Sequence, residues 1–141
     1  MNGMDVQTLP AADPSWAWFL DVDGTLVEIA HHPNAVSVGA RVLFTIETLA
    51  RAASGALALI SGRSIVDLDR LFLPLHLPCA GQHGLERRDA AGRIHIAGGP
   101  SPALDLVRNE LAGFAARHAG SLVEDKGLAV ALHYRNAPDA A

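Results

Sequence analysis

The stretch that most constrains this chain runs from Phe19 to Val27, where two aspartates and a glycine follow an apolar run. Residues 16–20 are large and apolar, which predicts a buried strand of a parallel sheet. Asp21 and Asp23 stand where that strand should end, and Gly24 permits the turn that lifts the chain off the sheet. Ligands of open α/β sheets bind outside the carboxyl ends of the strands, so the two carboxylates are predicted to lie at a functional site.

Two carboxylates placed side by side need a cation or a proton between them, because like charges are costly to bury together. A hard divalent cation with oxygen ligands is the simplest remedy, and Mg²⁺ is the usual one. We therefore expect Asp21 and Asp23 to hold Mg²⁺. The alternative is a strand end followed by an acidic turn, since Asp and Gly are common in turns.

Composition narrows the class of protein. The 141 residues suit one domain, half of them are hydrophobic, and the net charge of −4 comes without any basic run, which argues against nucleic-acid and anionic-membrane partners. The chain has neither the charged start nor the apolar run of a secretory signal, and no apolar stretch approaches the ~20 residues of a spanning helix. Cys79 is the only cysteine, so we expect a core thiol, no internal disulfide and a cytoplasmic protein.

The order of predicted elements indicates an α/β fold. Helical spacing and short apolar runs predict a helix over 38–52, a strand over 56–60, a helix over 65–72 and a strand over 77–80. Strands that alternate with helices form a parallel sheet with right-handed crossovers. We therefore expect a Rossmann-like parallel-sheet core.

The pattern changes after this first part. The sequence predicts a hairpin over 85–97 with its turn at 89–92, a linker over 98–102, an amphipathic helix over 103–118, and strands over 121–125 and 128–135. The expected division is a mobile leader over 1–15, a core over 16–98 and the start of a second α/β module over 99–141.

Three further motifs carry polar groups, and each leaves an alternative open. Ser61-Gly62-Arg63 follows the second strand, where a hydroxyl, free N–H groups and a guanidinium could hold a phosphate, although Ser61 could equally cap the next helix. His83, within the stretch 81–86, lies either near a ligand or at the surface of a tight turn. Glu124 and Lys126 would face the same way on a strand and suit sugar hydroxyls, or form a charged hairpin turn. His31-His32 is expected in an exposed loop rather than at a metal.

These motifs together resemble a known family. The stretch Asp21-Val22-Asp23-Gly24-Thr25-Leu26 resembles the first motif of the haloacid dehalogenase-like phosphatases. Residues 58–63, Gly81-x-His83-Gly84, Glu124-x-Lys126-Gly127 and His133-Tyr134-Arg135 resemble the bacterial trehalose-6-phosphate phosphatases over residues 16–138. The resemblance implies a Rossmann-like core with an inserted α/β cap, dependence on Mg²⁺, and cleavage of trehalose 6-phosphate to trehalose and phosphate.

The resemblance also implies residue roles. Asp21 would be the nucleophile and a metal ligand, and Asp23 the general acid/base that binds the metal through its backbone carbonyl. Ser61 would bind the transferring phosphoryl group, and Glu124 and Lys126 of the cap would bind the disaccharide. Further candidate phosphate- or substrate-binding residues are Val22, Gly62, Arg63, His83 and His133.

One departure from the family limits the expected activity. The superfamily requires a third-motif lysine and an acidic fourth motif, but Lys126 is the only lysine and no acidic pair follows Asp125. We therefore expect the N-terminal part of a phosphatase, with core and cap both incomplete and the 141 residues inactive alone. Two rival functions are a phosphatase for sucrose phosphate or another sugar phosphate, and a non-catalytic phosphoacceptor module like a response-regulator receiver.

Overall fold

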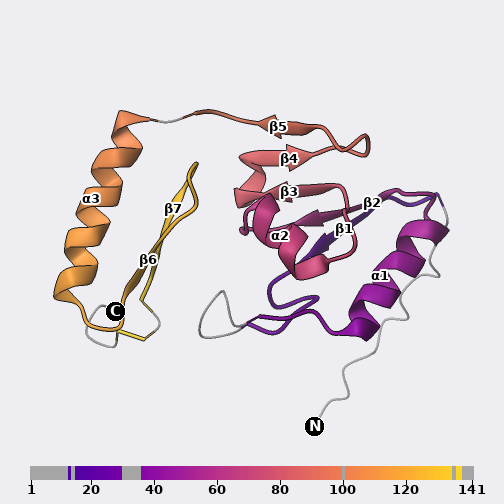
Figure 1. Cartoon of the computed structure of the whole chain (residues 1–141), viewed down its shortest axis with the longest axis horizontal. Coiled ribbons are helices and arrows are strands. Elements are labelled where there is room, and N and C mark those ends of the chain that lie inside the picture. Colours follow the sequence, from indigo (N-terminus) through magenta and orange to yellow (C-terminus); the bar gives the residue numbers. More distant parts are fainter. Residues whose placement is uncertain (1–12, 14, 30–35, 100, 135, 138–141) are drawn as a thin grey trace, which may run out of the picture.

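The computed structural model describes residues 13, 15–29, 36–99, 101–134 and 136–137 (Figure 1). The predicted leader lies almost wholly outside these residues, as do His31, His32 and Arg135. The elements, in chain order, are β1 (Trp18–Asp21), α1 (Ala40–Ala52), β2 (Leu57–Ile60), α2 (Ile65–Phe72), β3 (Cys79–Gly81), the single-turn 3-10 helix η2 (Gln82–Gly84), β4 (Glu86–Arg88), β5 (Ile94–Ile96), α3 (Pro102–Arg117), β6 (Leu122–Asp125) and β7 (Val130–His133).

The core is built on a five-stranded mixed sheet in the order β1-β2-β3-β4-β5. β1, β2 and β3 run parallel, as predicted, and the hairpin β4–β5 continues the same sheet in the antiparallel sense. Asp21 pairs in register with Ile60, so Asp21 and Ser61 mark the carboxyl ends of neighbouring strands. The α/β class is confirmed, and the sheet brings the two predicted phosphate motifs to one edge.

The hydrophobic core lies on one face of this sheet. The parallel strands are added in one direction, so right-handed crossovers place α1 and α2 on the same face. The side chains buried there are Val22, Val27, Ile46, Leu57, Leu59, Ile65, Leu68, Phe72 and Cys79. Cys79 is thus a buried free thiol, as predicted, and burial raises its pKa.

The opposite face of the sheet is open. Phe19 points to that face from β1, at the end of the strand order, and its exposed fraction is 69%. The prediction of a fully buried first strand is therefore wrong for Phe19, because no helix of the described chain covers this side. Ile60 on β2 is exposed on the same face.

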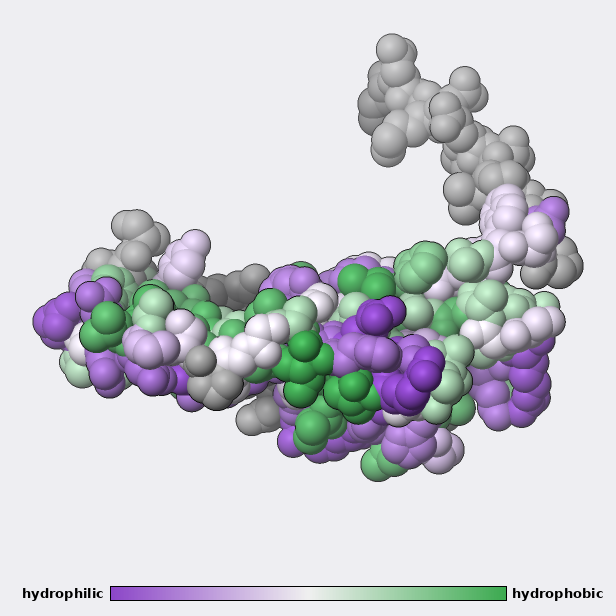
Figure 2. Space-filling view, turned by 90° about the horizontal axis from the view of Figure 1, so that it is seen from above, coloured by the Kyte–Doolittle hydropathy of each residue, from purple (hydrophilic) through white to green (hydrophobic). Residues whose placement is uncertain are grey.

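A small module forms the other end of the elongated molecule (Figures 1 and 2). Helix α3 packs against the antiparallel hairpin β6–β7, which is a separate two-stranded sheet (Figure 1). Arg108 of α3 fixes the hairpin turn by donating to Asp125 Oδ1 at 3.1 Å and to the Gly127 carbonyl at 2.6 Å. Within the part of the chain that the structure describes, no helix is long and apolar enough to cross a membrane.

Candidate active site

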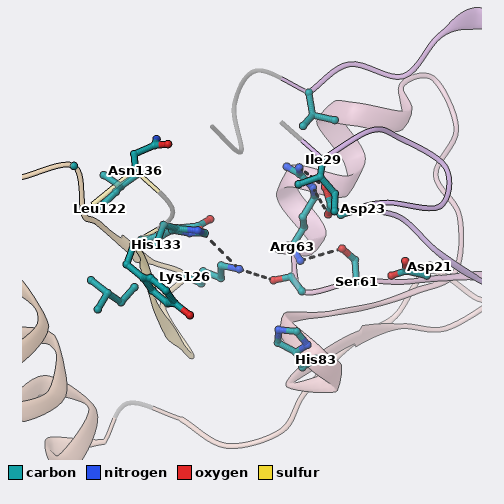
Figure 3. A pocket seen from close by; sticks show the side chains of 16 residues that line it. Asp21, Asp23, Ile29, Ser61, Arg63, His83, Leu122, Lys126, His133 and Asn136 are labelled. Carbon is teal, nitrogen blue, oxygen red and sulfur yellow. Dashed lines mark hydrogen bonds and ion pairs between the residues drawn. The ribbon is translucent and has the colours of Figure 1, made fainter. Parts of the chain in front are cut away.

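A cavity of about 670 Å³ lies between the core and the small module (Figure 3). This volume is typical of a pocket for a small molecule. The core contributes Asp21, Asp23, Ile29, Val36, Ser61, Gly62, Arg63 and His83, and the small module contributes Gly120, Leu122, Glu124, Lys126, Leu132, His133, Tyr134 and Asn136. Nine of the predicted site residues therefore line one cavity, although they come from segments up to about a hundred positions apart.

Asp21 stands at the carboxyl end of β1 with its carboxylate exposed to the cavity. The hydroxyl of Thr25 donates to Asp21 Oδ2 at 2.9 Å, a contact that was not predicted although Thr25 belongs to the first motif. The turn that follows has Gly24 at φ +88°, and three successive N–H groups donate to the Val22 carbonyl. The Val22 side chain is fully buried and does not line the cavity, so only its N–H could serve a ligand.

Asp23 is bound by Arg63 through both carboxylate oxygens. Arg63 Nε donates to Oδ2 at 2.8 Å, and Nη2 donates to Oδ1 at 2.7 Å. The Arg63 side chain is only 11% exposed, so the pair is partly shielded from water. The guanidinium that was predicted to face a phosphate is therefore engaged in fixing the direction of the Asp23 carboxylate.

Ser61 lies on the loop between β2 and α2 and is 5% exposed. Its Oγ accepts a hydrogen bond from Arg63 N at 3.1 Å, which leaves the hydroxyl proton to be donated toward the cavity. Ser64 caps α2 instead, because its Oγ accepts from Asp67 N. The helix-cap alternative for Ser61 is thus wrong.

His83 fits both predicted positions, one near a ligand and one at the surface of a tight turn. It lies in a tight turn with φ +58° and is exposed, yet it also lines the cavity. Its ring lies so close to Gly62 that a Cβ added at Gly62 would be 2.8 Å from His83 Nε2. Gly62 is therefore needed for a close approach between the two predicted motifs.

The wall formed by the small module carries Glu124, Lys126 and His133. Figure 3 shows Lys126 and His133 on this wall, across the cavity from Ser61 and Asp23. His133 Nε2 is 2.7 Å from Glu124 Oε2, and Lys126 Nζ is 3.6 Å from the same oxygen. Lys126 Nζ also donates to the Gly62 carbonyl at 2.8 Å, and the lysine side chain is 15% exposed. This hydrogen bond joins the small module to the loop that carries Ser61.

The oxygen atoms at the end of β1 suit a divalent cation in part. The Asp21 carboxylate and the Asp23 carbonyl are hard ligands of the kind such ions prefer. However, no group of three or more His, Cys, Asp or Glu side chains gathers around a possible metal position among the described residues. The chemistry of the donors fits a hard cation, and their number fills only part of an octahedral shell.

The parallel strands β1 to β3, with paired aspartates at the end of the first and a serine loop after the second, form the arrangement expected of a haloacid dehalogenase-like phosphatase. A family model described as Trehalose-phosphatase matches residues 19–141. The chain belongs to the trehalose-phosphatase family, whose fold and chemistry imply a divalent metal cofactor.

Individual relatives agree with this assignment. The trehalose-6-phosphate phosphatase of Escherichia coli (strain K12) is 47% identical over 129 residues, which are 92% of this chain and 48% of that protein. A crystal structure of a trehalose-6-phosphate phosphatase related protein superposes with a TM-score of 0.70 at 28% identity, over 85% of this chain and 52% of the other. The C-terminal domain of the C. albicans trehalose-6-phosphate phosphatase shares the fold, with a TM-score of 0.77 at 23% identity over 86% of this chain and 43% of that chain. The chain spans about half the length of the Escherichia coli relative and of the probable trehalose-phosphate phosphatase of Sinorhizobium fredii, with 48% and 47% covered.

Proposed function

We propose that this chain forms the N-terminal part of a Mg²⁺-dependent phosphomonoesterase that hydrolyses trehalose 6-phosphate to trehalose and phosphate in trehalose biosynthesis. The observation that supports the proposal is that the two walls of the cavity carry different kinds of polar group. Asp21 and Ser61 on the core wall suit a phosphoryl group, whereas Glu124 and Lys126 on the opposite wall suit sugar hydroxyls. A cytoplasmic location, where sugar phosphates are made, is part of the same proposal.

The reaction proceeds in two steps. An oxygen of Asp21 attacks phosphorus, the bond to the sugar oxygen breaks, and Asp23 gives a proton to that oxygen as trehalose leaves. Water then attacks the aspartyl-phosphate while Asp23 takes its proton, which releases phosphate and restores Asp21. The Ser61 hydroxyl donates to a phosphoryl oxygen in both steps, and Arg63 keeps the Asp23 carboxylate directed by its two hydrogen bonds.

A cation and the wall that carries Glu124, Lys126 and His133, here called the sugar wall, complete the proposed site. A Mg²⁺ ion held by the Asp21 carboxylate and the Asp23 carbonyl would offset the repulsion between Asp21 and the phosphate dianion. Glu124 accepts hydrogen bonds from sugar hydroxyls and is oriented by His133 at 2.7 Å. Lys126 donates to the sugar once it leaves the Gly62 carbonyl.

The test joins the chain to a C-terminal half taken from a full-length relative and assays phosphate release. Trehalose 6-phosphate should be cleaved faster than sucrose 6-phosphate, other sugar phosphates and p-nitrophenyl phosphate. Asp21→Asn should abolish turnover, because an amide cannot attack phosphorus. In the unsubstituted enzyme, phosphate trapped during turnover should be found on Asp21. A preference for another sugar phosphate would favour the rival phosphatase, and a stable phosphoprotein without sugar release would favour the receiver-like module.

A further inference from the structure

The loop 61–64 is hydrogen-bonded to the segment 82–83, which follows β3. His83 N donates to the Ser61 carbonyl at 3.1 Å, and Gln82 N donates to the Arg63 carbonyl at 2.8 Å. Both donors come from residues with left-handed backbone, Gln82 at φ +49° and His83 at φ +58°. Such conformations persist at non-glycine residues only where the surroundings impose them, so something must stabilise this turn.

Glu86 of β4 supplies that support. Its Oε1 accepts the N–H of Ile65 at 2.6 Å and the side-chain Nε2 of Gln82 at 3.2 Å. Ile65 is the first residue of α2, so its N–H has no partner within the helix. A carboxylate is also favoured at a helix N-terminus. One oxygen of Glu86 therefore fixes the far end of the loop and the strained turn together.

The backbone of β3 packs closely against this carboxylate. A Cβ added at Gly81, which pairs with Glu86 across β3 and β4, would be 2.8 Å from the Arg63 carbonyl oxygen and 2.9 Å from Glu86 Oε1. Glu86 does not line the cavity and contacts none of the reacting groups. Its influence on the site passes through the loop that carries Ser61 and Arg63, and through Arg63 to Asp23.

We propose that Glu86 is a positioning residue that holds the phosphate-binding loop 61–64 through Ile65 N–H and the Gln82–His83 turn. The proposal rests on the proposed function only for what the loop binds. The Glu86 carboxylate would then determine the positions of the Ser61 hydroxyl and of the Arg63–Asp23 ion pair.

Amide hydrogen exchange on the 141-residue chain tests this directly, without any need for phosphatase activity. Glu86→Ala should raise the exchange rates of the Ile65, Gln82 and His83 amides roughly tenfold to hundredfold, because their bonding partners are released. Glu86→Gln keeps an acceptor oxygen and should restore most of the protection. Arg87→Ala, an exposed neighbour on the same strand, should leave these rates unchanged.

Glu86→Asp distinguishes the effect of side-chain length from that of charge, since it keeps the carboxylate and shortens the side chain by one methylene. It should lose loop protection although Glu86→Gln does not, and this pair decides the matter even where the alanine variant fails to fold. A uniform rise that included Leu59 N, which is bonded to the Pro78 carbonyl in the sheet, would reduce Glu86 to a general stabilising role and overturn the proposal. Unchanged loop rates in Glu86→Asp would overturn it as well. Because hydrogen exchange does not depend on phosphatase activity, these results would still test the role of Glu86 if the phosphatase assay failed.

Discussion

Among single residues, Gly81 of β3 lies in close contact with the backbone of the loop 61–64. Its backbone is extended, at φ −100°, so only the space around it forbids a side chain. Gly81→Ala should lower the free energy of unfolding by about 1–3 kcal/mol, because the new methyl group would overlap the Arg63 carbonyl. Gly39→Ala is the matched control, since Gly39 at φ −70° has open space, with no atom within 4 Å of where its new methyl group would lie. Equal effects in urea unfolding would contradict the steric explanation.

Lys126 offers a prediction about specificity. It lines the cavity on the wall that we propose to bind the sugar, so Lys126→Ala should reduce kcat/KM for trehalose 6-phosphate roughly tenfold to hundredfold in the assembled enzyme, the loss expected for a hydrogen bond to a charged donor. The same variant should hardly affect p-nitrophenyl phosphate, which has no sugar. Parallel losses on both substrates would assign Lys126 to closing the cavity through Gly62 rather than to binding sugar.

Residue types and spacing predicted most of the cavity wall, because strand ends and motif glycines place Asp21, Ser61 and His83 at one edge. The partner of Arg63 could not be predicted in this way. Its pairing with Asp23 joins side chains 40 positions apart and depends on the loop geometry. The role of Glu86 was equally hidden, since a carboxylate on a strand gives no sign that a helix N-terminus lies beside it.

At the scale of elements, the ion pair between Asp69 of α2 and Arg88 of β4 fixes the second helix to the sheet. Arg88 donates to both carboxylate oxygens, at 2.8 and 2.7 Å, and its hydrogen bonds hold the pKa of Asp69 below the ordinary value of 3.8 against the opposing effect of burial. Arg88 also donates twice to the Leu77 carbonyl. Arg88→Met should therefore lower the free energy of unfolding by about 2–3 kcal/mol at neutral pH, measured by urea unfolding.

The pH dependence of that loss follows from the direction of the shift. A carboxyl with a depressed folded-state pKa stabilises the fold above its unfolded pKa, and this contribution is lost as pH falls through the folded value. The difference between wild type and Arg88→Met should thus be present above the unfolded pKa of Asp69, about 3.9, and shrink as the pH falls below it. Part of it should remain, because the bonds to Leu77 do not titrate. Arg87→Met, at the exposed adjacent position, should show little effect at any pH.

Elements with strong local signals were predicted best. The helix over 65–72 matches α2 residue for residue, and the hairpin turn at 89–92 lies between β4 and β5. The strand predicted over 77–80 is Cys79–Gly81 instead, because pairing with β2 and β4 decides where it begins and ends. Burial of Phe19 could not be judged from its apolar neighbours, since it depends on what lies against the other face of the sheet.

For the whole molecule, two surfaces of the core matter: among the described residues, no strand pairs with the outer edge of β1, and no helix covers the face of the sheet that carries Phe19. An edge strand with an exposed Phe19 is a surface on which further strands can pair and pack. The carboxyl end of β1 carries Asp21, so an element added there would bring its own side chains to the core wall of the cavity. Because the chain covers about half of the Escherichia coli and Sinorhizobium fredii relatives, we propose the other half of such a protein as the source of these elements.

We therefore predict that residues 1–141 alone release no appreciable phosphate from trehalose 6-phosphate, even with excess Mg²⁺. Lys126 is the only lysine in the sequence and, in our proposal, binds the sugar, so no lysine is left to stabilise the charge of the transferring phosphoryl group. Asp21 and the Asp23 carbonyl also supply too few ligands for octahedral Mg²⁺. Adding a separately expressed C-terminal half of a relative should restore turnover, and the same half with its catalytic lysine replaced should not. Robust turnover by the 141 residues alone would sink this prediction and move Lys126 from the sugar to the phosphoryl group.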